Sequence, residues 1–241
     1  MGLSDPDSLP VTTVTVFHYE SYTRFQAFAN MGRSLMKPFE EEGMVFCKLM
    51  GSGKNFGLVP DFSQYVFLAV WKSDAHADAF LQSATYRHLQ EGTDQTGTLY
   101  LRTQRAHGHW DGQSPFVKST QPVASDATPV AVLTRATIRY RALPDFWRHV
   151  PQARQRLQAH SENLLFGIGV GEVPLVQQCT ISVWRTAKAV DQYAYREAGH
   201  REVVQRTRQR QWYSEELFAR FSVFKAEGTL FTDIQRIICA I

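Results

Sequence analysis

The chain has 241 residues, of which 44% are apolar and 20% charged, and its formal net charge is +3. This composition is ordinary for a soluble globular protein, and the length allows one large domain or two of about 120 residues. The small net charge does not favour nucleic acid as a partner.

Three cysteines, Cys47, Cys179 and Cys239, are widely separated and odd in number. They predict neither a disulfide framework nor a zinc finger, and free thiols fit a reducing cytoplasm. Residues 1–10 lack an apolar signal core, and no window contains 18 consecutive apolar residues, so no membrane-spanning segment is expected. An apolar substrate would therefore have to be collected from a membrane or a partner protein, which is compatible with peripheral membrane contact.

The first half predicts strands and helices in a regular order. Residues 1–10 are expected to be a disordered lead. Runs of β-branched and aromatic residues predict strands at 11–19, 44–50, 65–71 and 99–105. Apolar residues at helical spacing predict helices at 21–36 and 73–90, the second with Ser73 as its N-cap.

Residues 111–128 are rich in Asp, Gly, Ser, Pro and Gln and predict a linker, after which the same order restarts. Strands are expected at 130–140, 164–170, 178–184 and 217–226. Helices are expected around 146–150, at 188–196 and from His200 onward.

The two halves share four features in the same order. These are MGSG at 50–53 and IGVG at 168–171, GLVP at 57–60 and GEVP at 171–174, strands ending in Trp71 and Trp184, and the later His88 and His200. A repeat of this length indicates duplicated domains, and its element order is that of the ferredoxin-like unit. We therefore expect an α+β fold in which two tandem ferredoxin-like repeats, residues 11–110 and 129–241, form a pseudo-twofold α+β barrel with the 111–128 linker on the outside.

His200 begins a predicted helix in a segment rich in arginine. Val203 and Val204 come next at helical spacing and share its face, whereas Arg201 and Arg208 lie on other sides. A neutral imidazole is a common metal ligand and the usual proximal ligand in many haem proteins. These residues alone favour a surface histidine and a solvated arginine face. A metal or haem ligand beside a site for an anionic group is the functional alternative.

The two halves differ in the residues on the C-terminal side of their histidines. Gly92 soon ends the predicted helix that carries His88, whereas His200 opens a long helix with an apolar face. The second half is therefore expected to hold the pocket.

Several stretches together resemble the spheroidene monooxygenase family, the carotenoid ketolases of purple phototrophic bacteria. They are FGLVP at 56–60, FLAVW at 67–71, LTRATI at 133–138, FWRHVP at 146–151, IGVGEVP at 168–174, and the segment from Gly199 and His200 to EELFARF at 215–221. The resemblance implies a haem-dependent oxygenase of the dimeric α+β-barrel type, with haem b and with His200 as the axial ligand of iron. It also implies insertion of oxygen at C-2 of an acyclic carotenoid, first as alcohol and then as ketone.

The resemblance further implies partners and a setting. A small apolar, carotenoid-like substrate and a ferredoxin-type electron donor are expected. A homo-oligomer is compatible with the family.

Arg135 alternates with apolar residues on a predicted strand, where burial of its charge requires an anionic partner. Beside a haem it is expected to pair with a propionate or to donate on the distal side; otherwise it would reach water from the strand end. Arg201 and Arg208 are further candidates for propionate partners. The expected apolar wall of the pocket consists of Val203, Val204 and Trp184, although Trp184 also fits an ordinary core position.

Other functions are compatible with the sequence. They are a haem enzyme acting on another small apolar or nitrogen-containing substrate, a non-enzymatic haem carrier, and a cofactor-free barrel. No Ser/His/Asp arrangement, nucleotide fingerprint or paired-carboxylate site stands out, so oxygen chemistry would need an external cofactor. Glu216 and Arg220, four residues apart, are expected to form a helical ion pair.

Overall fold

The computed structural model describes residues 9–20, 22–25, 28–29, 32, 39–54, 59–120, 127–159, 162–193 and 210–241, without the side chains of 152–159. Residues 1–8 of the predicted lead, much of the predicted helix at 21–36 and the segment that carries His200 lie outside the described residues.

The described strands of the first half are β1 (Val11–Tyr19), β2 (Met44–Gly53), β3 (Pro60–Trp71) and β4 (Thr93–Gly108). The predicted helix at 73–90 is two helices, α2 (Asp74–Leu81) and α3 (Ala84–Gln90). Ser73 caps α2 as predicted, because its hydroxyl accepts from the His76 N–H at 3.5 Å. The break arises because Ser83 caps a second helix in the same way, accepting from the Tyr86 N–H at 3.0 Å.

The second half contains β5 (Val130–Ile138), α4 (Leu143–Ala159), β6 (Leu164–Gly171), β7 (Gln177–Trp184), α5 (Ala187–Asp191) and β8 (Tyr213–Gly228). A terminal helix that the sequence did not predict, α7 (Thr232–Cys239), comes after β8 and buries Ile234. Glu216 and Arg220 lie on β8, so the predicted helical ion pair between them is wrong. Arg220 instead donates to Asp191 at 2.9 Å.

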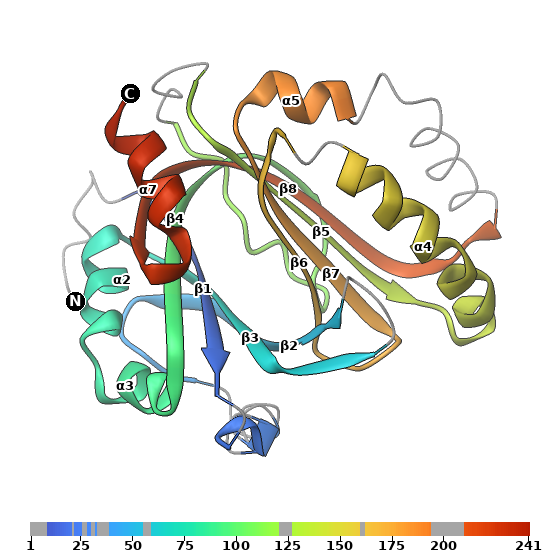
Figure 1. The fold of residues 1–241 in the computed structure, drawn as a ribbon, viewed down its shortest axis with the longest axis horizontal. Coiled ribbons are helices and arrows are strands. Elements are labelled where there is room, and N and C mark those ends of the chain that lie inside the picture. The colour runs from blue at the N-terminus through green and yellow to red at the C-terminus, as the bar shows by residue number, and fades with distance from the viewer. Residues whose placement is uncertain are drawn as a thin grey trace.

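The strands form one closed barrel in the order β1-β3-β2-β6-β7-β5-β8-β4. Within each half the fourth strand lies beside the first, the first beside the third, and the third beside the second, which is the ferredoxin-like order. Helices α2 and α3 cover the first half, and α4 and α5 lie over the second (Figure 1). The predicted α+β fold of two ferredoxin-like repeats in a pseudo-twofold barrel is therefore confirmed.

The two junctions between the halves are unequal. Strands β4 and β8 pair over eleven residue pairs, from Gly97 with Gly228 to Gly108 with Leu217. Strands β2 and β6 pair only at Gly51 with Gly171 and Ser52 with Val170. The barrel is thus continuous at one junction and barely closed at the other.

The segment between the halves does not stay outside the barrel. Phe116 packs on Phe221 with ring centroids 5.1 Å apart, and Trp110 packs on Phe46 at 5.4 Å. Both rings belong to the apolar cluster that fills the barrel interior. The prediction of an external linker at 111–128 is therefore wrong at Phe116, because its ring completes the core.

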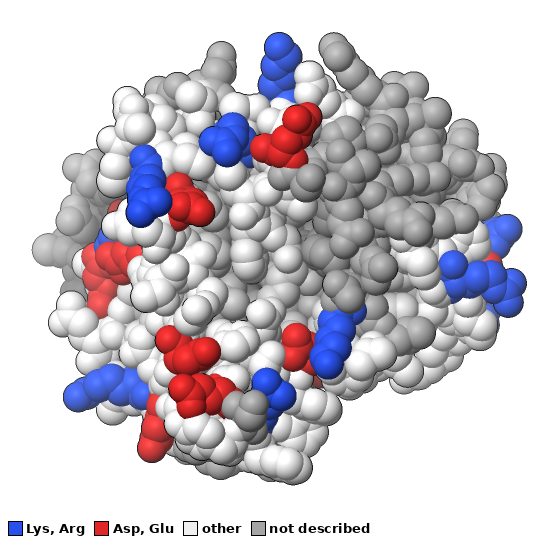
Figure 2. Space-filling view, in the orientation of Figure 1, with Lys and Arg blue, Asp and Glu red and all other residues white. Residues whose placement is uncertain are grey.

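The described surface carries no large field of one charge sign on the face shown in Figure 2, where acidic and basic side chains lie near one another. This mixture agrees with the small net charge of +3. None of the described helices is long and apolar enough to cross a membrane.

Candidate functional site

The two described members of the predicted site lie on opposite faces of the sheet. Arg135 pairs in register with Cys179, whose side chain belongs to the barrel interior. Trp184 pairs with Val130, and both belong to a cluster on the outer face with α5. Because side chains alternate along a strand, Arg135 points into the barrel and Trp184 points away from it.

Arg135 is buried at 3% exposure and has anionic partners within the protein. Its guanidinium donates to Glu215 and, at 3.0 Å, to Asp111, and it lies 5.5 Å from the centre of the Trp110 ring. The alternative of a strand-end arginine that reaches water is therefore wrong. Glu215 comes from β8 and Asp111 from the segment between the halves.

The charge network continues across the barrel. Lys48 donates to Asp111 at 2.5 Å and pairs with Glu172 at 2.7 Å, and Glu172 also accepts from the Trp110 indole at 2.8 Å. Burial alone would lower the pKa of Lys48, but hydrogen bonds and charge from Asp111 and Glu172 raise it. The network thus joins two cations, Arg135 and Lys48, to three carboxylates, Asp111, Glu172 and Glu215.

The outer face of the first half is sealed. Phe17 and Phe67 are fully buried there. Phe67 stacks on Phe80 of α2 at 5.2 Å, and Phe17 contacts Tyr86 of α3 at 5.9 Å. Aromatic side chains of the sheet and the two helices therefore fill the interface around Phe17 and Phe67.

The equivalent face of the second half has much smaller side chains. Since Val11 pairs with Trp71 and Val130 pairs with Trp184, the registers of the two halves can be superposed. Ala136 then stands at the position of Phe17, Thr180 at that of Phe67, and Thr134 at that of Thr15.

We call this surface the outer floor. It comprises Thr134, Ala136, Gly167, Gly169 and Thr180, with both glycines on the outer side of β6 opposite Ser182 and Thr180. Thr134 is exposed although it lies in the middle of a strand with neighbours on both sides, whereas Thr15 is 1% exposed. Ala136 and Gly169 are buried and Gly167 and Thr180 are partly exposed, so the outer floor is a surface of small side chains that is open mainly at Thr134.

Aromatic clusters stand at both ends of the outer floor. At one end Trp184 packs on Tyr193 at 5.0 Å. At the other, Phe146 packs on Trp212 at 5.9 Å within a cluster that includes Ile138. The predicted wall residue Trp184 thus borders the floor.

The chain leaves the described residues after Tyr193 and returns at Arg210, which pairs with Asp145 of α4 at 2.6 Å. Both ends of this gap lie on the side of the outer floor. The remaining predicted site residues, His200, Arg201, Val203, Val204 and Arg208, lie outside the described residues.

Arg220 is a residue at this face that the sequence did not single out as a cofactor partner. It lies on β8 opposite Val132, donates to Asp191 at 2.9 Å and to the Ala187 carbonyl at 3.4 Å, and its Nε is buried without a partner. The signal that could have revealed the outer floor was present in the repeat, since aligning the strands places Ala136 against Phe17. Within the described residues, no group of three or more His, Cys, Asp or Glu side chains is arranged to hold a metal ion.

Comparison with known proteins identifies the family. A search of family models finds no match. The chain is 33% identical to a spheroidene monooxygenase of Rubrivivax gelatinosus over 191 residues, which is 78% of this chain and 72% of that protein. The chain belongs to the spheroidene monooxygenase family. Its members from Cereibacter sphaeroides and Rhodobacter capsulatus are 36% and 28% identical over 189 and 225 residues.

Coverage differs among these members of the spheroidene monooxygenase family. The matched region is 76% of this chain but only 57% of the Cereibacter sphaeroides protein, whereas it is 92% of this chain and 93% of the Rhodobacter capsulatus protein. Among solved structures, aldoxime dehydratase in complex with butyraldoxime has a TM-score of 0.57 at 10% identity and covers 94% of this chain and 85% of its own. A second aldoxime dehydratase structure has a TM-score of 0.56 at 13% identity, with coverage of 92% and 83%. At these identities the likeness concerns the fold.

Proposed function

We propose that this protein is a haem-dependent monooxygenase that oxidises an acyclic carotenoid at C-2, with electrons from a ferredoxin-type donor. The family supports a monooxygenase of a carotenoid-like substrate. The observation that carries the haem proposal is the outer floor, where the second half has Ala136 and Thr180 in place of the buried Phe17 and Phe67 of the first. A surface of small residues between two aromatic clusters leaves room for a planar apolar cofactor.

In this proposal His200 is the axial ligand. The described chain ends at Tyr193 and resumes at Arg210 on the side of the outer floor, so the segment between them has both its ends at that surface. An imidazole facing an apolar pocket is the usual proximal arrangement, and haem b bound there would supply the oxygen-activating chemistry. Val203, Val204 and Trp184 would supply apolar contacts.

The propionates of the proposed haem need cationic or hydrogen-bonding partners. Arg201 and Arg208, from the same segment as His200, are proposed for this role, and Arg220 lies on the outer face with a free Nε. A propionate or distal role for Arg135 would require a route through the sheet and the release of Glu215 and Asp111 from its guanidinium. Of the two described arginines, Arg220 is therefore better placed than Arg135 to bind a propionate.

The decisive test compares two histidines. His200→Ala, expressed with ample haem, should lose the Soret band, with haem affinity reduced by more than about 100-fold, beyond the range seen when only outer-shell partners of a metal ligand are removed. His88→Ala is the matched control, because His88 lies on α3 with its side chain 50% exposed beside Glu91. It should keep the wild-type spectrum.

Activity on an acyclic carotenoid is measured on the same preparations with reduced ferredoxin. A normal Soret band and activity in His200→Ala would place the ligand elsewhere. Wild-type protein that takes up no haem would favour the cofactor-free barrel, and haem uptake without oxygenation would favour a carrier or another haem enzyme.

A further inference from the structure

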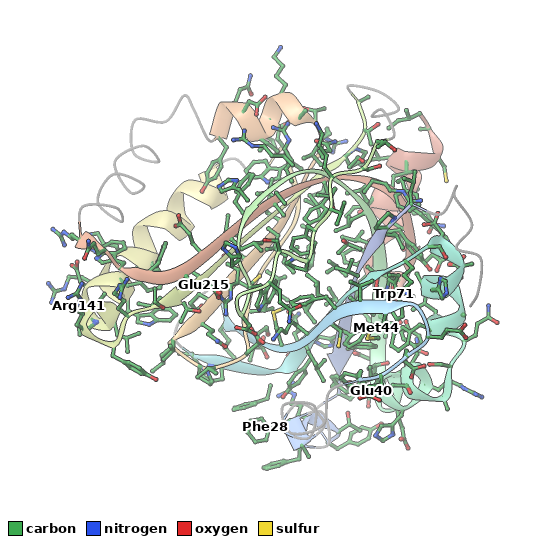
Figure 3. All side chains as sticks on the ribbon, turned by 180° about the vertical axis from the view of Figure 1, so that it is seen from behind. Phe28, Glu40, Met44, Trp71, Arg141 and Glu215 are labelled. Carbon is green, nitrogen blue, oxygen red and sulfur yellow. The ribbon has the colours of Figure 1, made fainter. Side chains whose placement is uncertain are left out.

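A cleft of about 170 Å³ opens where β2 meets β6. Its walls come from equivalent parts of the two halves, since Gly51–Gly53 and Tyr65 face Gly169–Gly171 and Gln178. Phe62, Leu175 and Trp147 are further lining residues. Phe62 is 48% exposed and packs on Phe28 with ring centroids 5.6 Å apart; Phe28 stands at the edge of the molecule in Figure 3.

Tyr65 carries the main polar feature of this cleft. Its side chain is 2% exposed, and its hydroxyl is buried without a hydrogen-bond partner. Three other polar lining residues have partners within the protein: Ser52 donates to the Asp61 carbonyl at 3.3 Å, the Asp61 carboxylate accepts from Ser63 at 2.5 Å, and Glu172 pairs with Lys48. Buried hydroxyls are normally paired, so an unpaired one on a residue that lines a cleft points to a partner supplied by a ligand.

Tyr65 is a donor under ordinary conditions. Burial, followed by the negative charge of Asp61, raises its pKa to about 12. At neutral pH the hydroxyl therefore keeps its proton and can donate to an oxygen acceptor.

The cleft is continuous with the outer floor. Gln178 lies two residues before Thr180 on the same face of β7, which corresponds to a separation of about 7 Å. Gly169 pairs in register with Thr180 and also lines the cleft. A molecule bound in the cleft therefore lies at the edge of the outer floor, on the same side of the sheet.

We propose that this cleft binds one end of an elongated apolar molecule, that the Tyr65 hydroxyl donates a hydrogen bond to an oxygen near that end, and that the remainder leaves the cleft past the exposed Phe62 ring, beside the outer floor that the proposed haem would occupy. The proposal rests on the proposed function and adds the binding path of its substrate. Aromatic rings and bare glycine backbone suit a hydrocarbon chain, whereas a sugar or nucleotide would need several polar partners. A space of about 170 Å³ holds only an end of such a molecule.

The test uses all-trans-retinol, a polyene with one terminal hydroxyl, and axerophthene, its hydrocarbon counterpart. Each is titrated into the purified full chain while quenching of tryptophan fluorescence is recorded, because Trp147 lines the cleft. Tyr65→Phe should weaken retinol binding about tenfold, the effect of losing one hydrogen bond, and leave axerophthene binding unchanged. Tyr140→Phe, at a residue 79% exposed and outside the cleft lining, is the matched control.

A second readout is independent of the ligand. Without ligand, Tyr65→Phe should have the wild-type Tm or a higher one, since it removes an unpaired buried hydroxyl. A lower Tm would show that the hydroxyl has a partner within the protein and would overturn the proposal, as would equal retinol affinity in wild type and Tyr65→Phe.

The haem spectrum of each preparation keeps the two proposals apart. Wild-type protein with a Soret band but no effect of Tyr65→Phe would overturn the cleft assignment and leave the haem proposal standing. Selective loss of retinol binding in Tyr65→Phe, in protein that takes up no haem, would support the cleft and contradict the haem proposal.

Discussion

Arg135 shows how a buried charge is accommodated inside this barrel. Its guanidinium pairs with Glu215 and Asp111, and Lys48 pairs with Asp111 and Glu172. The sequence predicted that a buried Arg135 needs an anionic partner, and the structure provides two, Glu215 and Asp111. The identity of the anion could not be predicted, because Glu215 is 80 positions away and becomes a neighbour only when β5 pairs with β8.

Glu215, labelled in Figure 3, is the carboxylate through which the network should respond to acid. Burial alone would raise its pKa, but the N–H groups of Gly112 and Asp111 and the Arg135 guanidinium together lower it. A carboxyl with a lowered folded pKa stabilises the fold above its unfolded pKa, about 4.3 for Glu, and this contribution is lost as pH falls through the folded value. We therefore expect the free energy of unfolding to decrease below about pH 4.3 in the wild type, and less steeply in Glu215→Gln.

Urea unfolding at a series of pH values measures this difference. Glu216→Gln makes the same change on the other face of β8 and controls for the general loss of a carboxylate. If Glu215→Gln has the same acid dependence as the wild type, Glu215 does not contribute through its ionised form.

At the scale of elements, all eight strands were predicted to exist, but most were predicted too short. Strand β8 begins at Tyr213 rather than at residue 217, and β4 extends from Thr93 to Gly108. The polar ends of these strands lack an apolar pattern of their own, because their partners on the barrel provide the pairing. The helix break at Ser83 was in principle visible, since serine is a preferred N-cap.

The outer floor leads to a prediction about β7. Thr180→Phe restores the side chain that stands at the equivalent position in the first half, where Phe67 packs on α2. A ring on the floor should reduce haem loading by at least about tenfold while the fold survives, because overpacking typically costs about 1–3 kcal/mol. The ratio of Soret to protein absorbance measures the loading, and circular dichroism measures the fold.

Thr180→Ser is the matched control and should load haem as the wild type does. Full haem occupancy in Thr180→Phe would mean that the cofactor does not lie on this part of the sheet. The floor was not predicted from the sequence, because its residues are small and belong to three strands, and only a residue-by-residue alignment of the two repeats shows which larger side chains they replace.

At the scale of the whole molecule, the unequal junctions of the barrel predict where it opens first. Strands β4 and β8 share eleven residue pairs, whereas β2 and β6 share two, at Gly51 and Ser52. Local opening costs less where fewer pairs must break, so amides bonded across the β2–β6 junction should exchange at least about tenfold faster than those in the middle of the β4–β8 pair. Hydrogen exchange monitored by NMR measures both sets in one sample, and equal protection would show that the barrel opens as a unit.

The barrel order and its pseudo-twofold axis could be predicted from the internal repeat, because duplicated strand order leaves few ways to close a sheet. The place of Phe116 could not, since a segment rich in turn residues is normally expected at the surface. Its ring lies in the core through contact with Phe221, which no local pattern records.

Joining the halves in one chain has an evolutionary consequence. When two copies of one subunit form a symmetric dimer, every substitution appears twice. A change that replaces large side chains by small ones on one sheet must therefore do so on the other. Here Phe67 and Thr180 are separate positions in a single gene and can be selected separately. One half can therefore keep a tightly packed face that maintains stability, while the other accepts the loss of packing that a binding surface demands.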